Sequence, residues 1–273
     1  MNTALLEKRK NLESLIRKLE SVVVAFSGGV DSTLVLAVAC SVLGEKVLAV
    51  TAQSESLPQR ELEEAKSRAV EMGVEHRIIE TGEMQSADYT SNPADRCYYC
   101  KSELYSRLQT VAKEKNFSHI VNGINLDDLG DHRPGIAAAK EAGVRSPLSE
   151  AGLSKEDVRA LSKEYQLSTW KKPAMACLSS RVPYGQPITA EKLAMIEQAE
   201  DFLFTLGFAQ LRVRHHGDIA RIELSQEDLA GFFSRDLAAR VETRFREIGF
   251  QYTTLDITGY RTGSLNETLA LKK

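Results

Sequence analysis

Two of the four cysteines in this chain are spaced one helical turn apart. Cys97 and Cys100 occur in the stretch DRCYYCK, and Cys177 occurs much later in PAMACLSSR. Residues at i and i+3 share one face of a helix, so the first two thiols can act on the same ligand. Such a pair is typical of a disulfide, a zinc site or a more reactive thiol site, and its surroundings must decide among these alternatives.

The third thiol bears on this choice. A structural zinc ion usually has four protein ligands, and here the fourth would come from His76, His119 or His132. A redox pair would leave Cys177 without a role. Three thiolates and one open position suit an iron–sulfur cluster whose labile iron could carry an additional sulfide. Cys40 lies on the apolar helix face LAVAC, where we expect an ordinary core residue.

The composition sets the general class of protein. The 273 residues are 42% hydrophobic and 27% charged, a globular mixture that permits one large domain or two unequal ones. The net charge of −3 and the isoelectric point near 6.0 argue against a nucleic-acid partner. No apolar run reaches the roughly 18 residues of a membrane span, and the start of the chain predicts an amphipathic helix rather than a signal peptide. We therefore expect a cytoplasmic protein with no membrane partner and with reduced thiols.

The stretch SGGVDST, residues 27–33, lies between an apolar strand and a helix, where a nucleotide-binding loop is expected. We expect Gly28 and Gly29 to adopt positive φ and to let the backbone approach a ligand closely. The amides of residues 30–33 would open the helix, where unpaired N–H groups and the helix dipole favour an anion. The alternative is a tight turn with Asp31 in the first helical turn, but the flanking strand and helix favour a phosphate site. Hydroxyl donors are added by Ser27, Ser32 and Thr33.

The elements that must position these residues alternate between strand and helix. Parallel strands joined by helices predict a doubly wound α/β sheet, whose ligands bind at the carboxyl ends of the strands. The relevant ends are the polar turns AFSGG, VTAQS and VNGINLDD. We predict strands at 21–29, 46–52, 75–81 and 119–123, and helices at 30–44, 58–73 and 97–116.

The sequence changes character after CLSSRVPYGQP, so we predict a domain boundary near residue 185. Residues 1–185 would form the nucleotide-binding domain and residues 186–273 a smaller α+β domain that binds substrate or mediates assembly. In the second domain we predict a helix at 190–206, strands at 210–216 and 219–225, another helix and a last strand near 252–257.

Charged residues in the second half suggest a phosphate site. A strand places Arg212 and Arg214 on one face, and two planar guanidinium groups make a good phosphate clamp. The alternative, equally weighted on the residues alone, is a solvated strand face with the arginines paired to Glu223 or Asp218. The adjacent histidines of HHGD point in opposite directions on a strand, so we predict no metal site there.

The polar loop at 124–135 contains several acids. Magnesium prefers carboxylates together with phosphate oxygens, so one of these acids is a candidate ligand. A solvated loop is the alternative. The residues concerned are Asp127, Asp128, Asp131 and the neighbouring Arg133.

The motif SGGVDS after an apolar strand resembles the PP-loop of the N-type ATP pyrophosphatases. Four later segments resemble the LarE family of ATP-dependent sulfur transferases, namely residues 121–135, 145–167, 172–185 and 212–224. The resemblance implies that a substrate oxygen is adenylated by ATP with release of pyrophosphate, and that a sulfur nucleophile then displaces AMP. It implies a small-molecule substrate, pyridinium-3,5-biscarboxylic acid mononucleotide, whose carboxylates are thiolated on the route to the nickel-pincer nucleotide.

The resemblance also implies roles for individual residues, with ATP, Mg²⁺ and a 4Fe–4S cluster as cofactors. Family members with three such cysteines are understood to hold the cluster, which suggests Cys97, Cys100 and Cys177 as catalytic residues and metal ligands. The nucleotide would bind Ala25, Ser27, Gly28, Gly29, Val30, Asp31, Ser32, Thr33, Thr51 and Gly123. The substrate phosphate would bind Arg133, Ser180, Arg181, Arg212 and Arg214, with Asp128, Glu200 and Glu223 as acidic site residues.

Several alternatives remain within and beyond this family. Other LarE proteins have a single cysteine near ACLSSR and donate its own sulfur, so sacrificial donation by Cys177 is the first alternative. An amide-forming relative of NAD or GMP synthetase would need no cysteines, and a tRNA thiolase should be more basic. A non-catalytic nucleotide sensor would release no pyrophosphate. We also expect a sulfide or other sulfur donor and, by resemblance, a homo-oligomer.

Overall fold

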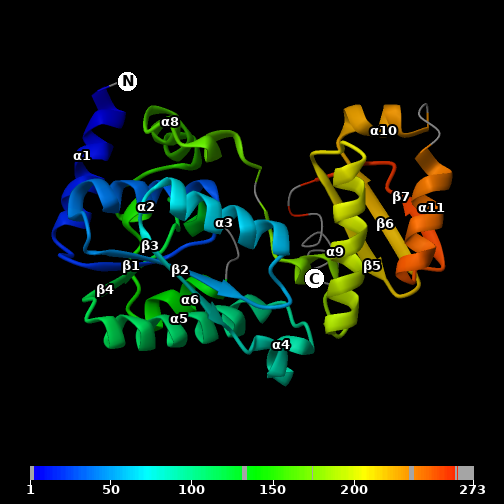
Figure 1. Cartoon of the computed structure of the whole chain (residues 1–273), viewed down its shortest axis with the longest axis horizontal. Coiled ribbons are helices and arrows are strands. Elements are labelled where there is room, and N and C mark those ends of the chain that lie inside the picture. Colours follow the sequence, from blue (N-terminus) through cyan, green and yellow to red (C-terminus); the bar gives the residue numbers. More distant parts are fainter. Residues whose placement is uncertain (1–2, 131–133, 174, 234–236, 262, 264–273) are drawn as a thin grey trace. The chain divides into compact units, whose positions relative to one another are not determined.

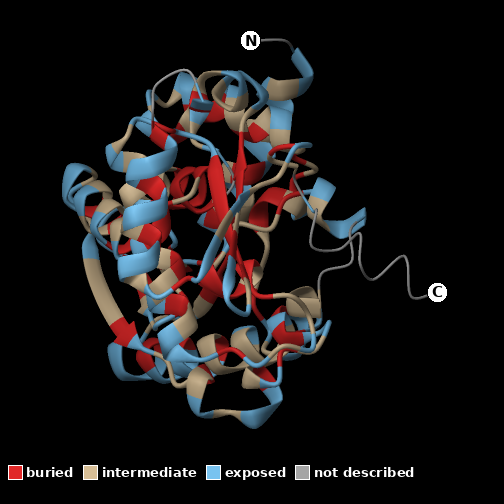
Figure 2. Ribbon diagram, turned by 90° about the vertical axis from the view of Figure 1, so that its right-hand side faces the viewer, coloured by how far each residue is buried: buried red, intermediate tan, exposed pale blue. Residues whose placement is uncertain are grey.

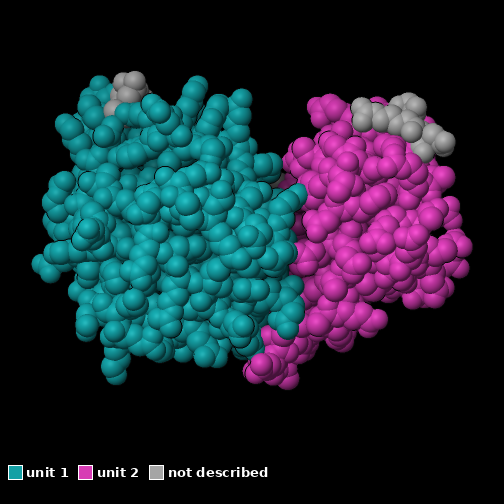
Figure 3. Space-filling view, viewed as in Figure 1, with its two compact units in different colours: residues 1–83, 95–175 teal, residues 84–94, 176–273 magenta. Residues whose placement is uncertain are grey.

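The computed structural model describes residues 3–130, 134–173, 175–233, 237–261 and 263. The chain divides into two compact units, coloured separately in Figure 3. Unit 1 comprises residues 1–83 and 95–175, and unit 2 comprises residues 84–94 and 176–273. Each unit is therefore assembled from two separate stretches of the sequence. The division into domains at residue 185 stays a prediction.

Unit 1 is built on a parallel four-stranded sheet in the order β3-β2-β1-β4 (Figure 1). Its strand β1, VVVA, is a short β-branched run with three buried residues, typical of a strand that is covered on both faces. Strands that follow one another in the sequence are joined by helices, because parallel strands require a crossover connection. The strands are β1 (Val22–Ala25), β2 (Val47–Gln53), β3 (Glu75–Glu80) and β4 (His119–Val121).

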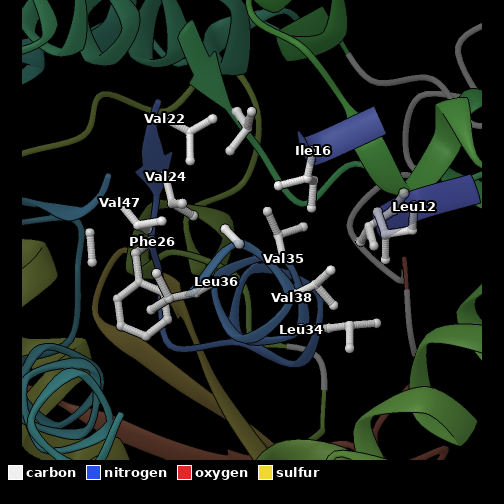
Figure 4. Close-up of a cluster of buried hydrophobic side chains, with 14 of the residues drawn as sticks. Leu12, Ile16, Val22, Val24, Phe26, Leu34, Val35, Leu36, Val38 and Val47 are labelled. Carbon is white, nitrogen blue, oxygen red and sulfur yellow. The ribbon is translucent and has the colours of Figure 1, made fainter. Parts of the chain in front are cut away.

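Alternate residues of β1, β2 and β4 belong to two apolar clusters, one on each face of the sheet. Val22 and Val24 pack with α1 (Thr3–Arg17), α2 (Val30–Leu43) and α3 (Gln59–Glu71), as the close-up in Figure 4 shows in part. The opposite face, including Val23 and Val50, packs with α5 (Arg96–Lys115) and α6 (Pro134–Glu141). Buried residues accordingly concentrate on the strands and on the helix sides that face them (Figure 2). This arrangement confirms the predicted doubly wound α/β fold.

Several elements of unit 1 were not predicted. The helix α8 (Lys155–Glu164) packs on the cluster of α1 and α2, and it begins at a capping box in which Ser154 and Asp157 bond each other's backbone amides. The further short elements are α7 (Pro147–Glu150) and the 3₁₀ turns η2 (Asp127–Gly130) and η3 (Ser168–Lys171), while the 3₁₀ turn η1 (Glu83–Gln85) begins at the last residue before the unit boundary.

Unit 2 contains a three-stranded mixed sheet in the order β5-β6-β7. β5 (Leu211–His216) and β6 (Ile219–Leu224) pair antiparallel, whereas β7 (Tyr252–Leu255) joins β6 in parallel. Its apolar core lies between this sheet and two helices, α9 (Ala190–Thr205) and α11 (Leu237–Ile248). We predicted one helix between the last two strands, but the structure has α10 (Gln226–Phe232) as well as α11.

The segment 84–94 belongs to unit 2 although it interrupts unit 1 in the sequence. It includes α4 (Ala87–Thr90) and the buried Asn92, whose side-chain amide donates to the carbonyls of Val182, Pro183 and Gln186. The Tyr89 hydroxyl bonds the Ser179 hydroxyl at 2.6 Å. These bonds tie the segment to the chain that follows residue 176.

No helix in the described parts of the chain is both long enough and apolar enough to cross a membrane.

Candidate functional site

The glycine-rich loop joins β1 to α2 in unit 1. Gly28 has a φ of +67°, and a Cβ there would lie 3.1 Å from the Ala65 Cα atom, so only glycine fits without strain. Gly29 has a φ of −79° and is the N-cap of α2, so the prediction of positive φ was wrong for this residue. The helix can begin there because an extended N-cap is the usual entry into a helix. The loop is closed by a bond of 3.1 Å between the hydroxyls of Ser27 and Ser32.

The start of α2 has the features of an anion site. Thr33 already donates its amide to the Gly29 carbonyl at 3.0 Å, so the first-turn amides that remain for a ligand belong to residues 30–32. The Thr33 hydroxyl is buried and has no hydrogen-bond partner in the described part of the chain. These donors fit a polyphosphate group, which a helix N-terminus favours electrostatically.

The loop after β4 packs directly against this helix start. A Cβ on Gly123 would lie 2.8 Å from the backbone nitrogen of Ser32, so the close approach requires glycine. The Asp31 carboxylate accepts from Asn125 at 3.1 Å and forms an ion pair with Lys155. Asp31 therefore fixes the two loops together.

The acids of the loop after β4 also have structural partners. One Asp128 oxygen accepts the Asn125 amide at 3.0 Å, and one Asp127 oxygen accepts the Lys155 amide at 2.8 Å. The magnesium role of Asp128 stays a prediction. Asp131, His132 and Arg133 lie outside the described residues, so their predicted roles stay predictions too.

Thr51, a predicted nucleotide residue on β2, uses its side-chain hydroxyl in two hydrogen bonds within the protein. Its hydroxyl donates to the Phe26 carbonyl at 2.7 Å and lies 2.8 Å from Nε2 of His76. Because the hydroxyl proton is used, His76 Nε2 must donate this second bond. Burial, with a smaller effect of Lys66, lowers the pKa of His76 and favours its neutral form. Ala25 ends β1, so the predicted nucleotide residues share the carboxyl ends of β1, β2 and β4.

The CxxC pair opens α5. Cys97 is exposed and Cys100 is half-buried, and neither forms a disulfide. Glu103, one turn after Cys100, accepts the Gly82 amide at 3.3 Å, which places the start of α5 beside the loop that follows β3. These two thiols and the glycine-rich loop therefore lie at the same end of the sheet in unit 1. A helix N-terminus favours negative charge, which suits thiolate ligands.

Cys177 lies in unit 2, at the N-cap of η4 (Leu178–Arg181). Its carbonyl accepts bonds of 2.8 Å from both the Ser180 hydroxyl and Nη1 of Arg181. The same guanidinium nitrogen donates to the Ala176 carbonyl at 2.6 Å. The backbone that carries the Cys177 thiol is thus held by a side chain four residues away.

Arg181 is fully buried and forms a two-bond ion pair with Glu200, at 2.9 Å for each bond. Although burial lowers the pKa of Arg181, the Glu200 carboxylate more than offsets this effect and raises it. Glu200 also accepts the Val213 amide at 3.0 Å, which links η4 to β5. These contacts support a positioning role for Arg181, and its predicted contact with a substrate phosphate stays a prediction.

Arg212 and Arg214 are buried rather than solvated. Arg214 forms a two-bond ion pair with Glu223, at 3.0 and 2.8 Å, and donates to the Ser180 carbonyl at 2.8 Å. The Arg212 guanidinium stacks over the Tyr260 ring at 5.1 Å. Burial and the nearby Arg181 lower the pKa of Arg212, so an anion beside it would be favourable.

A charged cluster near the glycine-rich loop had no signal in the sequence. Lys172 forms ion pairs with Glu61 at 2.6 Å and Glu64 at 2.8 Å, and all but Glu64 are largely buried. Arg68, on the same helix α3, donates to the Gly28 carbonyl at 3.3 Å. The helical pattern of residues 58–73 is simply that of a charged surface helix, so the burial of Glu61 could not be read from it.

Neither unit brings three or more described His, Cys, Asp or Glu side chains together as a metal site. The prediction that Cys97, Cys100 and Cys177 act on one ligand stays a prediction. Cys40 packs at the edge of the unit 1 core, and burial raises the pKa of its thiol, in keeping with the expected core role.

Comparisons with known proteins extend these observations. The model of the family described as queuosine biosynthesis protein QueC matches residues 21–94. A pyridinium-3,5-bisthiocarboxylic acid mononucleotide synthase from Lactiplantibacillus plantarum is 41% identical over 263 residues, or 96% of this chain and 95% of that protein. An uncharacterized Synechocystis protein is 47% identical over 96% of this chain and 98% of its own length. A glutamine-hydrolyzing GMP synthase component from Sulfurisphaera tokodaii is 26% identical over 52% of this chain and 42% of that protein.

Proposed function

Because this chain belongs to the LarE family of ATP-dependent sulfur transferases, we propose that it thiolates the carboxylates of pyridinium-3,5-biscarboxylic acid mononucleotide for nickel-pincer nucleotide synthesis. The observation that carries this proposal is the 41% identity to the synthase along 96% of the chain. A glycine-rich loop at the carboxyl end of β1, suited to a polyphosphate, supports the use of ATP.

The first half-reaction activates the substrate. A carboxylate oxygen of the substrate attacks the α-phosphorus of ATP, the bond to the bridging oxygen breaks, and pyrophosphate leaves. The amides of residues 30–32 and the hydroxyls of Ser27, Ser32 and Thr33 would hold the departing pyrophosphate. Mg²⁺ would be held by these phosphates and by Asp128, and it would neutralise their charge.

The second half-reaction transfers sulfur. A sulfur nucleophile attacks the carbonyl carbon of the acyl adenylate, the bond to AMP breaks, and a thiocarboxylate remains. Carboxylates need this activation because oxide is a very poor leaving group, whereas AMP is a good one. Arg212 and Arg214 would orient the substrate through its own phosphate, since buried guanidinium groups bind phosphate strongly.

Cys97, Cys100 and Cys177 would hold a 4Fe–4S cluster, which would supply a sulfide at its open iron. The absence of disulfides at all three positions and the location of the first two at a helix N-terminus support this assignment. The alternative is that Cys177 gives up its own sulfur and becomes dehydroalanine.

The function is tested with anaerobically purified protein, ATP, Mg²⁺, the biscarboxylic acid mononucleotide and sulfide. We expect stoichiometric pyrophosphate and AMP, together with a product in which sulfur replaces oxygen. Product formed with ammonia instead of sulfide would indicate an amide-forming enzyme, and an absence of pyrophosphate would contradict the proposal. Mass spectrometry of the protein after one turnover separates the sulfur sources, because sacrifice of Cys177 removes the mass of H₂S from the chain.

A further inference from the structure

A buried carboxylate lies at the carboxyl ends of β2 and β3 in unit 1. Glu83 opens η1, three residues after the end of β3, and only 4% of its surface is exposed. Ser54 and Ser56 follow the end of β2. None of these three residues belongs to the sulfur site or to the glycine-rich loop described above.

The two serines satisfy only one oxygen of this carboxylate. Oε1 of Glu83 accepts the Ser54 hydroxyl at 2.6 Å and the Ser56 hydroxyl at 3.0 Å. Oε2 is buried and has no hydrogen-bond partner among the described residues. A buried carboxylate oxygen without a donor is unfavourable, and such groups are normally satisfied by protein, water or a ligand.

The cluster formed by Glu83, Ser54 and Ser56 lies at the end of the sheet where we expect the nucleotide. Ser54 follows β2 directly, β2 lies beside β1, and β1 leads into the glycine-rich loop at the same end of the sheet. Ser54 is half-buried and its neighbours Gln53 and Glu55 are exposed, so the cluster lies just beneath the surface of this rim. A nucleotide whose phosphates occupy the loop after β1 extends its nucleoside toward the end of a neighbouring strand.

We infer that Glu83 is a specificity residue for ATP, and that its Oε2 accepts a hydrogen bond from a ribose hydroxyl. Ser54 and Ser56 hold the carboxylate in place through its other oxygen. This inference rests on the proposed use of ATP. It adds a contact to the nucleoside, whereas the residues of the glycine-rich loop act on the phosphates.

The test compares the binding of ATP, 2′-deoxy-ATP and 3′-deoxy-ATP by calorimetry, with Mg²⁺ present and the second substrate absent. We expect the wild-type protein to bind at least one deoxy analogue about tenfold or more weakly than ATP, because the missing hydroxyl leaves Oε2 unpaired. In Glu83→Met this discrimination should fall to within about twofold. Glu80→Met, which changes an exposed glutamate at the end of β3, is the matched control and should keep the full ratio.

Equal affinity of the wild-type protein for all three nucleotides would overturn the inference even if Glu83→Met does not fold. A discrimination that survives in a folded Glu83→Met protein would overturn it as well. If ATP itself does not bind, the proposed function fails rather than the ribose contact alone.

Discussion

At the scale of single residues, the most informative side chain is Arg181. Its guanidinium is fully buried, and it connects the Glu200 carboxylate to the backbone carbonyls of Ala176 and Cys177. A planar group with several fixed donors can make these bonds at once, and a lysine ammonium cannot match that geometry. The Cys177 thiol is therefore carried by a backbone that hydrogen bonds from Arg181 hold in place.

The first prediction concerns this arginine. We expect Arg181→Lys to reduce thiocarboxylate formation at least tenfold and to lower the free energy of unfolding by about 2–4 kcal/mol, because Glu200 loses its two-bond partner. Product assays and chemical denaturation measure the two effects. Arg240→Lys, on the exposed side of α11, should change neither. Unchanged sulfur transfer in a stable Arg181→Lys protein would contradict the positioning role.

The second prediction concerns the thiols. We expect Cys97→Ala, Cys100→Ala and Cys177→Ala each to abolish the binding of iron and sulfide, because each removes one ligand of a three-thiolate site. Iron and acid-labile sulfide are measured in anaerobically purified protein. Cys40→Ala should keep both, since Cys40 packs on the core. Full cluster content in all three single variants would show that the thiols do not share one cluster.

At the scale of elements, the glycine-rich loop is braced from both sides within unit 1. Ala65 and Arg68 of α3 contact Gly28, and the loop after β4 packs on Ser32. Lys172 is anchored to α3 through Glu61 and Glu64. The nucleotide site is thus positioned by packing and ion pairs beyond the motif itself.

The third prediction tests the packing of the loop after β4. We expect Gly123→Ala to weaken ATP binding at least tenfold, because its methyl group would collide with the backbone nitrogen at the start of α2. Calorimetry with ATP provides the measurement. The control is Gly130→Ala, since a Cβ at Gly130 meets nothing within 4 Å. Equal ATP affinities of Gly123→Ala and the wild type would contradict the close approach.

The fourth prediction tests the brace on α3. We expect Lys172→Met to lower the free energy of unfolding by about 3 kcal/mol, because the buried Glu61 carboxylate would lose its cation. Denaturant titration followed by circular dichroism measures the loss. Lys113→Met, at the end of α5, is the control and should lie within about 0.5 kcal/mol of the wild type. A Lys172→Met protein as stable as this control would show that the ion pair contributes little.

At the scale of the whole molecule, the chain combines unit 1, which contains the glycine-rich loop, with the smaller unit 2, and each unit has its own apolar core. Both His215 and His216 of unit 2 have a pKa that burial lowers, with further lowering by Lys192 for the first and Arg221 for the second. Each histidine is therefore neutral in the folded protein at a pH where an unfolded histidine takes up a proton.

The fifth prediction follows from these two histidines. Above their ordinary pKa of about 6.5 both states are neutral, and below it the unfolded state binds protons first, so the free energy of unfolding should fall as the pH falls. Denaturation at pH 7.5 and pH 5.5 measures the change. The double variant His215→Phe and His216→Gln should show a smaller loss. An identical pH dependence in the variant would assign the effect to other groups.

The sequence predicted the regular parts of this architecture well. The four strands of unit 1 lie at the predicted stretches, and Leu104, Leu108 and Val111 of the predicted helix at 97–116 pack on the sheet. The glycines also predicted the turn after β1, where Gly28 has the expected positive φ. Gly29 has an ordinary negative φ instead, because it is the N-cap of α2. Local pattern suffices here because each of these features depends on neighbouring residues.

The buried charges could not be predicted in the same way. Arg181, Glu200 and Glu83 are charged residues whose burial depends on partners distant in the sequence. The same holds for Arg214, whose pairing with Glu223 was only one of two alternatives. Tertiary contacts decide whether a charge is solvated, and no local pattern records them.

The discontinuity of unit 2 has a consequence for synthesis on the ribosome. Residues 84–94 emerge long before residues 176–188, which contain the acceptors of Asn92 and the hydroxyl partner of Tyr89. Until residues 176–188 have been translated, residues 84–94 lack these hydrogen-bond partners and remain solvated. A nascent chain halted at residue 175 would therefore carry an exposed Tyr89, and a protease should cut it there and spare the finished protein.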